Sequence, residues 1–157
     1  MKIPLKEMDM PLTEKKFYVL VNGFHAVVLR NAGTATQPHM EQVWTAEDVL
    51  SHTVRPRVSR PGRVFESASR RRSAYEAKSH LLSQKRLFLE NVMHKLEQLI
   101  VSGECDAIVL IAAPSALGIL RAIMPRTVAH RITLEVAKDY AKSGVKGLES
   151  KVLHYIV

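Results

Sequence analysis

The stretch DAIVLIAAP, residues 106–114, decides the fold class of this chain. Asp106–Ala112 is apolar without alternation, which is typical of a strand covered on both faces in a parallel sheet. Pro114 stands where a first helical residue would, because the N–H that proline lacks has no helical partner at that position. We therefore predict a strand over Asp106–Ala112 followed by a short helix over Ser115–Ile123, a pairing characteristic of α/β proteins.

A long helix is predicted before this strand. Ser73-Ala-Tyr-Glu76 matches a capping box, in which the serine oxygen and the glutamate bond free backbone N–H groups. Gly103 supplies the left-handed residue that commonly ends a helix. The pattern predicts a helix over Ala74–Ser102. Its apolar residues recur at a helical spacing, at Leu82, Leu89, Val92, Leu96 and Leu99.

Three strands are predicted nearer the N-terminus. Phe17–Val21 (FYVLV) is β-branched and aromatic, and Ala26–Leu29 (AVVL) follows it closely. The pair Asn22-Gly23 between these two runs is a strong hairpin signal. After a polar loop, Gln42–Thr45 (QVWT) is predicted as the third strand.

The remaining elements complete a mixed sheet. Ile132–Val136 (ITLEV) is predicted as a strand and Val145–Tyr155 as a final amphipathic helix, so the order is β-β-β-α-β-α-β-α. An antiparallel meander followed by β-α crossovers predicts an α/β fold with helices on the faces of a mixed sheet, in the order of the ribonuclease H-like fold. We expect a single domain over residues 16–157 and a flexible tail over residues 1–15.

Composition narrows the class of partner and the compartment. Lys and Arg number 23 against 15 Asp and Glu, a formal net charge of +8, which favours an anionic partner or solubility. The single cysteine, Cys105, excludes an internal disulfide and fits a reducing compartment. The first residues lack the apolar run of a signal peptide. The longest apolar run, Ala107–Pro114, is far shorter than the roughly 20 residues of a membrane span. We expect a soluble, cytoplasmic protein without a membrane partner.

An arginine-rich loop is predicted at about residues 51–73, where helical and strand periods are both absent. Loops of this length are usually functional or disordered. Arginine binds phosphate through two N–H groups at once, and backbone contacts dominate affinity for nucleic acid. We predict nucleic-acid binding, RNA before DNA. An acidic protein or polysaccharide partner, or a solvated loop without a partner, stays open. The arginines are Arg55, Arg57, Arg60, Arg63, Arg70, Arg71 and Arg72.

Several motifs resemble those of a known family. They are RPGRVFE (60–66) with RRSA (71–74), VLIAAP (109–114) with Leu117-Gly118 and Leu120-Arg121, LEV (134–136) and KDYAK (138–142). Together they resemble the family named "protein required for attachment to host cells". That family is grouped with bacterial and archaeal release-factor-like proteins, which are similar to the middle domain of archaeal and eukaryotic class 1 release factors.

The resemblance implies a role at the ribosome, with one departure. In those release factors the loop that enters the long helix carries a Gly-Gly-Gln motif, which reaches the peptidyl-tRNA ester. By position, residues 55–72 correspond to that loop. Here the loop contains only Gly62, followed by Arg63, and no Gly-Gly-Gln. Peptidyl-tRNA hydrolysis by the usual route is therefore not expected.

The sequence contains no catalytic constellation that we can identify. Nucleases of the ribonuclease H-like fold need clustered carboxylates for two metal ions, and the strand Phe17–Val21 contains no acid. Glu90 and Glu97 on the long helix lack carboxylate partners. The histidines show no metal-binding spacing, and Cys105 is interpreted as a core or junction residue rather than a nucleophile. We expect no catalytic residue, cofactor or metal.

Two weaker binding positions follow predicted strands. Ser115 opens a helix at the carboxyl end of a strand, where free N–H groups favour anions. Lys138 and Lys142 flank Asp139 after the last strand and are expected near the same edge of the sheet. In each case the alternative is an ordinary junction or a solvated surface.

Three functions therefore remain open. The first is a non-catalytic module that binds transfer or ribosomal RNA through the arginine-rich loop. The second is an indirect factor for host attachment or surface-polysaccharide synthesis that docks a protein partner. The third, ranked last, is a hydrolase of aminoacyl or peptidyl esters, for which the loop offers only Ser59, Ser67 and Ser69 as hydroxyls.

Overall fold

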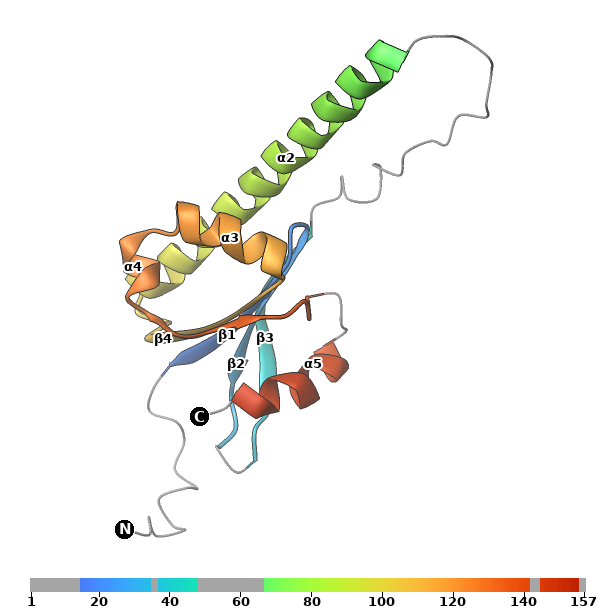
Figure 1. The fold of residues 1–157 in the computed structure, drawn as a ribbon. Helices are drawn as coiled ribbons and strands as arrows, with labels where there is room; N and C mark the ends of the chain where they lie inside the picture. The colour runs from blue at the N-terminus through green and yellow to red at the C-terminus, as the bar shows by residue number, and fades with distance from the viewer. Residues whose placement is uncertain (1–14, 35–36, 48–66, 142–144, 156–157) are drawn as a thin grey trace.

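A five-stranded mixed sheet forms the centre of the computed structural model, which describes residues 15–34, 37–47, 67–141 and 145–155 (Figure 1). The strand order is β3-β2-β1-β4-β5. β1 pairs antiparallel with β2, and β2 with β3, whereas β4 runs parallel to β1 and to β5. The predicted mixed sheet is therefore confirmed. The strands are β1 (Lys16–Val21), β2 (His25–Asn31), β3 (Met40–Glu47), β4 (Ala107–Ala112) and β5 (Ile132–Ala137).

Helices cover both faces of this sheet. One buried cluster joins β1 and β4 to α2, α3 and α4, and a second cluster on the other face includes Val152 of α5. All six positions of β4 are buried, with Leu110 in the first cluster and Ile111 in the second. The prediction of a strand covered on both faces is thus confirmed. The helices are α2 (Ser67–Val101), α3 (Pro114–Ile123), α4 (Arg126–Ala129) and α5 (Val145–Val152), which a 3₁₀ turn (Leu153–Tyr155) follows.

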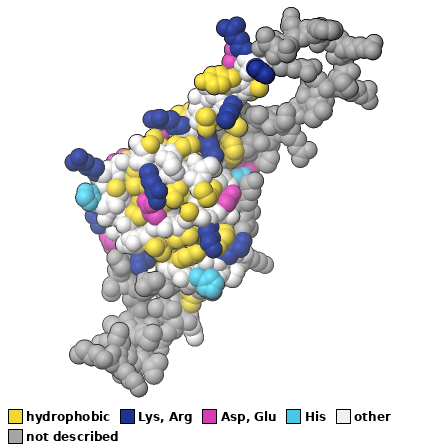
Figure 2. All heavy atoms as spheres, in the orientation of Figure 1, with side chains coloured by type: hydrophobic (Ala, Val, Ile, Leu, Met, Phe, Trp, Pro, Cys, Tyr) yellow, Lys and Arg dark blue, Asp and Glu magenta, His cyan; other side chains and the backbone are white. Residues whose placement is uncertain are grey.

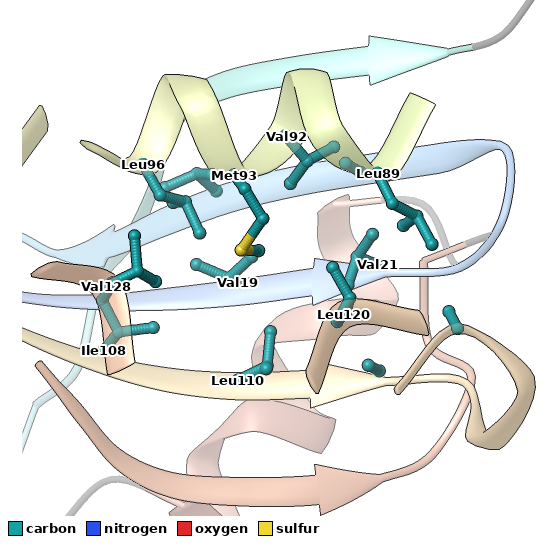
Figure 3. Close-up of a cluster of buried hydrophobic side chains, with 14 of the residues drawn as sticks. Val19, Val21, Leu89, Val92, Met93, Leu96, Ile108, Leu110, Leu120 and Val128 are labelled. Carbon is teal, nitrogen blue, oxygen red and sulfur yellow. The ribbon is translucent and has the colours of Figure 1, made fainter. Parts of the chain in front are cut away.

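The larger cluster holds α2 against the sheet. Figure 3 shows side chains from α2 pointing toward those of β1 and β4. Leu120 of α3 and Val128 of α4 belong to the same cluster. Burial of each such side chain contributes about 1.5–3 kcal/mol. The α2 residues in this contact include Leu89, Val92, Met93 and Leu96.

The hairpin between β1 and β2 is closed differently from the expected Asn-Gly turn. Val21 pairs with Ala26, and the N–H of Asn22 donates to the carbonyl of His25 (2.9 Å), which leaves Gly23 and the next residue at the centre. Gly23 does not have a positive φ. The Asn22 side chain fixes the turn instead, because its Oδ1 accepts the N–H groups of Phe24 (2.9 Å) and His25 (2.8 Å).

The start of the long helix differs from its prediction. α2 begins at Ser67, so Ser73 and Glu76 lie within the helix and form no capping box at its end. The predicted loop at 51–73 is therefore too long at its C-terminal end, and Arg70, Arg71 and Arg72 are helical. The physical reason is composition: residues 67–78 contain neither glycine nor proline and are rich in alanine and arginine, which favour helix.

The other end of α2 follows the prediction closely. Gly103 has φ +75°. Its N–H donates to the carbonyl of Ile100 (3.1 Å), and the N–H of Glu104 donates to that of Leu99 (3.0 Å), a Schellman arrangement.

Other predictions need smaller corrections or lie outside the described residues. The order of elements contains one helix that the sequence did not predict, α4. β3 and β5 are longer than predicted, and the final helix ends in the 3₁₀ turn. Residues 1–14 of the predicted tail and residues 51–66 of the predicted loop lie outside the described part. Within the described part, no helix combines the length and the apolar character that crossing a membrane requires.

Candidate nucleic-acid interface

The N-terminal half of α2 extends beyond the sheet and the other helices (Figure 1). The helix has 35 residues. Among the α2 side chains that the structure describes, the first buried one is Phe88, and every residue from Arg71 to His80 is exposed. This half of α2 therefore contributes little to the core and presents its side chains to the surroundings.

Positive charge dominates the exposed half of α2. Arg71, Arg72 and Lys78 are exposed, and Glu76 is the one acid between residues 71 and 89. Figure 2 shows Lys and Arg side chains alternating with hydrophobic ones along this helix. A cluster of exposed cations with a single acid attracts phosphate groups.

Part of the predicted arginine set lies on this helix. Arg71 and Arg72 are exposed on α2, and Arg70 belongs to the same helix, with its side chain outside the description. The remaining predicted arginines lie outside the described residues; they are Arg55, Arg57, Arg60 and Arg63.

A lysine from the middle of α2 reaches the start of α3. The Lys85 ammonium donates to Ser115 Oγ (3.0 Å), and Ser115 is the second residue of α3. The Lys85 stem crosses the β1–β2 turn, where a Cβ on Gly23 would overlap it. The residue before α3, Ala113, gives its N-terminus no side-chain cap. The predicted anion-binding position at Ser115 therefore lies beside the Lys85 ammonium, a contact that the sequence did not indicate.

The parallel strands end beside this pair. The N–H of Ala113 donates to the carbonyl of Val21 (3.0 Å), which joins the ends of β1 and β4. Beyond β5, Asp139 Oδ1 accepts a hydrogen bond from Asn22 Nδ2 (3.2 Å), while Lys138 is exposed. Ligands of open α/β sheets bind at this edge, outside the carboxyl ends of the strands. Lys142 lies outside the described residues.

The structure groups the predicted residues into two places. Ser115 and the segment after β5 lie at the carboxyl edge of the sheet, together with Lys85. Arg71 lies fourteen residues before Lys85 on the same helix, a separation of about 21 Å along its axis at 1.5 Å per residue. A ligand that touches both places has to extend along α2.

Lys85 is the main residue that the sequence analysis missed. It stands three, four and seven residues before Phe88, Leu89 and Val92, on the side of α2 that enters the core. A lysine at that position of a helical apolar stripe was the available signal, although sequence spacing does not show which residue its ammonium contacts.

The interpretation of Cys105 as a core residue is confirmed. Its side chain is buried, and its Sγ donates a weak hydrogen bond to the carbonyl of Ala107 (3.5 Å). Burial, and then the charge of Asp106, raise the pKa of the Cys105 thiol to about 11. At neutral pH this thiol is therefore protonated and shielded. In the described residues, no three His, Cys, Asp or Glu side chains gather in a way that could hold a metal ion.

Comparison with known proteins places the chain in a family. No match was found among curated proteins. A family model described as bacterial archaeo-eukaryotic release factor family 12 matches residues 16–152, from the first residue of β1 to the last of α5. This match confirms the release-factor part of the resemblance seen in the sequence. The chain belongs to bacterial archaeo-eukaryotic release factor family 12.

Proposed function

We propose that this protein is a non-catalytic module that binds RNA, either transfer RNA or the ribosome. The observation that carries the proposal is the exposed, positively charged half of α2, with Arg71 and Arg72 near its tip. Membership of a release-factor family supports an RNA partner rather than another polyanion. The proposal requires the protein to act in the cytoplasm, where ribosomes are found.

The proposed contacts run from the tip of α2 to the sheet edge. The arginines at the tip, with those of the segment before it (Arg55, Arg57, Arg60 and Arg63), neutralise backbone phosphates. Ser115 with Lys85 supplies an anion contact at the start of α3, where the helix dipole favours negative charge. Lys138 and Lys142 add charge beyond β5.

The strand arrangement supports a ribonuclease H-like fold. Three antiparallel strands lead into two parallel ones, and the β-β-β-α-β-α-β-α order is interrupted only by the short α4. We propose this fold as the scaffold, with its usual nuclease chemistry absent, because the carboxylates that such chemistry needs are missing from β1.

Binding of labelled transfer RNA and of purified ribosomes across a salt series tests the proposal. Wild type is compared with a variant in which Arg70, Arg71 and Arg72 are all changed to Glu, a helix-compatible replacement. The matched control changes Lys95, Arg126 and Arg131 to Glu, which alters net charge equally, away from the tip of α2.

We expect wild type and control to bind, with the logarithm of the association constant falling by about 0.7 to 0.9 per phosphate contact for each decade of salt. The arginine variant loses binding. Equal loss in both variants would mean that net charge, and not α2, attracts RNA. Absence of binding by wild type would overturn the proposal.

An alternative function is an indirect part in host attachment or surface-polysaccharide synthesis, through a protein partner. The observation that favours it is an apolar pocket of about 340 Å³ between the edge strand β3 and α2. Trp44, Leu87 and Phe88 line this pocket, and Leu87 is 60% exposed. Unchanged activity in attachment assays after loss of RNA binding, combined with loss on Leu87→Asp, would favour this alternative.

A further inference from the structure

One face of the projecting half of α2 combines cations with exposed apolar side chains. Residues seven apart on a helix differ by only about 20° around its axis. Arg71, Lys78 and Lys85 form one such series, and Tyr75 and Leu82 form another. Tyr75 and Leu82 are 76% and 51% exposed. The two series lie side by side, because positions three and four apart are neighbours on a helix.

This face is the outward continuation of the side of α2 that enters the core. Leu89 and Leu96 continue the series of Tyr75 and Leu82, and both are fully buried. Lys85 marks the boundary between the buried and the exposed part of this side of α2. Its ammonium contacts Ser115 at the carboxyl edge of the sheet. The exposed face therefore lies on the same side of α2 as that edge. After Lys85 this side of the helix is apolar and buried, and before Lys85 basic and apolar residues alternate on it.

Charge decides which class of partner fits this face. If this face paired with the same face of a second copy, Arg71, Lys78 and Lys85 would meet like charges, which is unfavourable. The one acid of the region, Glu76, lies about 160° around the helix from Lys78, at 100° per residue. A partner that complements this face supplies negative charges and apolar groups in alternation. Nucleic acid does so, with phosphates and bases.

We infer that this face binds unpaired nucleotides, with a base stacked on Tyr75 between phosphates held by Arg71 and Lys78. The inference rests on the proposed function and specifies the form of RNA that is bound. In a duplex the bases stack on one another and offer no free face to a side chain. Aromatic side chains within a basic surface are the usual platform for single strands. Arg71 and Lys78 lie about 10.5 Å apart along the axis, which leaves the Tyr75 ring accessible between them.

The test compares a short labelled RNA strand of mixed sequence with the same strand annealed to its complement. Fluorescence anisotropy measures the binding of each RNA to the full chain. The variants are Tyr75→Ala, Tyr75→Trp and Lys78→Ala. Two controls are matched to them: His80→Ala, an exposed ring on the opposite side of α2, and Arg86→Ala, whose cation is paired with Glu90 (3.0 Å).

We expect the single strand to bind more tightly than the duplex. Tyr75→Ala should weaken single-strand binding about 5- to 100-fold, with an unchanged salt slope, and Tyr75→Trp should retain it. Lys78→Ala should reduce the salt slope by about 0.7, as loss of one phosphate contact on a single strand requires. His80→Ala and Arg86→Ala should bind as wild type does.

The outcomes separate this inference from the proposed function. Equal affinity for single strand and duplex, with no effect of Tyr75→Ala, overturns the inference and leaves the proposed function standing. No binding of either RNA overturns the inference, whereas the proposed function is overturned only if transfer RNA and ribosomes also fail to bind. Displacement of the RNA by polyglutamate at a lower concentration than by unlabelled single strand would assign this face to an acidic protein instead. Each variant changes an exposed side chain, and circular dichroism of each variant is the check that its helix content is unchanged.

Discussion

The Asn22 side chain connects two segments that are distant in the chain. It is the one buried polar residue of the described part, at 5% exposure. Its Oδ1 accepts two backbone N–H groups of the β1–β2 turn, and its Nδ2 donates to Asp139 beyond β5. A single amide thereby shapes a hairpin and ties the end of β1 to a segment more than a hundred residues later in the chain.

Replacement of Asn22 by alanine should lower the free energy of unfolding by about 1–3 kcal/mol, because it leaves the N–H groups of Phe24 and His25 without their acceptor. Urea denaturation measures the change. Asn91→Ala, an exposed asparagine on α2, is the control and should shift stability by less than about 0.5 kcal/mol. Similar small effects at both positions would contradict the structural role of Asn22.

Cys105 should make the free energy of unfolding sensitive to alkaline pH. Its folded pKa is raised from 9.0 to about 11, mainly by burial. Between these values the unfolded chain releases the thiol proton and the folded chain keeps it, so stability falls as pH rises. The slope from this group is at most about 1.4 kcal/mol per pH unit.

The free energy of unfolding, measured by urea titration at pH values from 9 to 11, checks this expectation. Lysines and tyrosines titrate in the same range, and comparison with Cys105→Ala cancels them. The difference between the two proteins should therefore shrink as pH rises through this window. A difference that is independent of pH would refute the burial effect on the thiol.

At the scale of elements, the two ends of α2 show which helix signals are reliable. The C-terminal end is a backbone requirement: Gly103 has φ +75°, which residues with a Cβ adopt at a cost of about 1–2 kcal/mol. The N-terminal capping box at Ser73 was a wrong prediction, because the same four residues fit equally well inside a helix when the preceding residues also favour it.

Two glycine substitutions should change stability in opposite directions. A Cβ at Gly103 or at Gly118 would meet no atom within 4 Å, so backbone conformation alone decides the outcome. Gly103→Ala should destabilise by about 1–2 kcal/mol. Gly118→Ala, within α3, should stabilise by about 0.5–1 kcal/mol, since alanine loses less backbone entropy on folding. Thermal unfolding of the two variants measures both, and a shared sign would contradict this explanation.

The bulge in β3 is another element-scale feature that was not predicted. The register between β2 and β3 shifts so that Val28 pairs with Trp44 and Leu29 with Gln42. The extra residue, Val43, changes which face later side chains occupy. Trp44 and Ala46 consequently pack on the side of α2. Alternation in the sequence does not reveal such a shift, because a strand keeps its period of two on either side of a bulge.

At the scale of the whole molecule, the core and the projecting half of α2 are distinct regions on one continuous helix. Leu96→Ala removes a fully buried side chain and should cost about 2–5 kcal/mol. Leu82→Ala, two heptads earlier on the same side but 51% exposed, should cost less than about 0.5 kcal/mol. Urea denaturation of both variants checks the contrast. Equal losses would mean that Leu82 is buried in solution.

Much of the candidate interface could be predicted, but its assembly could not. The arginines at positions 70–72 stand out in the sequence because basic residues cluster there, although they were assigned to a loop. Ser115 was identified from its position after a buried strand. The contact between Lys85 and Ser115 spans thirty residues, and no local pattern encodes a contact between two such distant segments.

The sequence by itself determined most of the elements, because their causes are local. The unbroken apolar run of β4, the heptad-spaced leucines of α2 and the glycine at its C-terminal end each act through neighbouring residues. Tertiary structure alone decided where the core ends along α2 and which lysine contacts the start of α3. It also decided which side of the projecting helix lies toward the sheet edge. These depend on the packing of segments that are distant in the chain, where the same helical pattern is equally compatible with burial and with exposure.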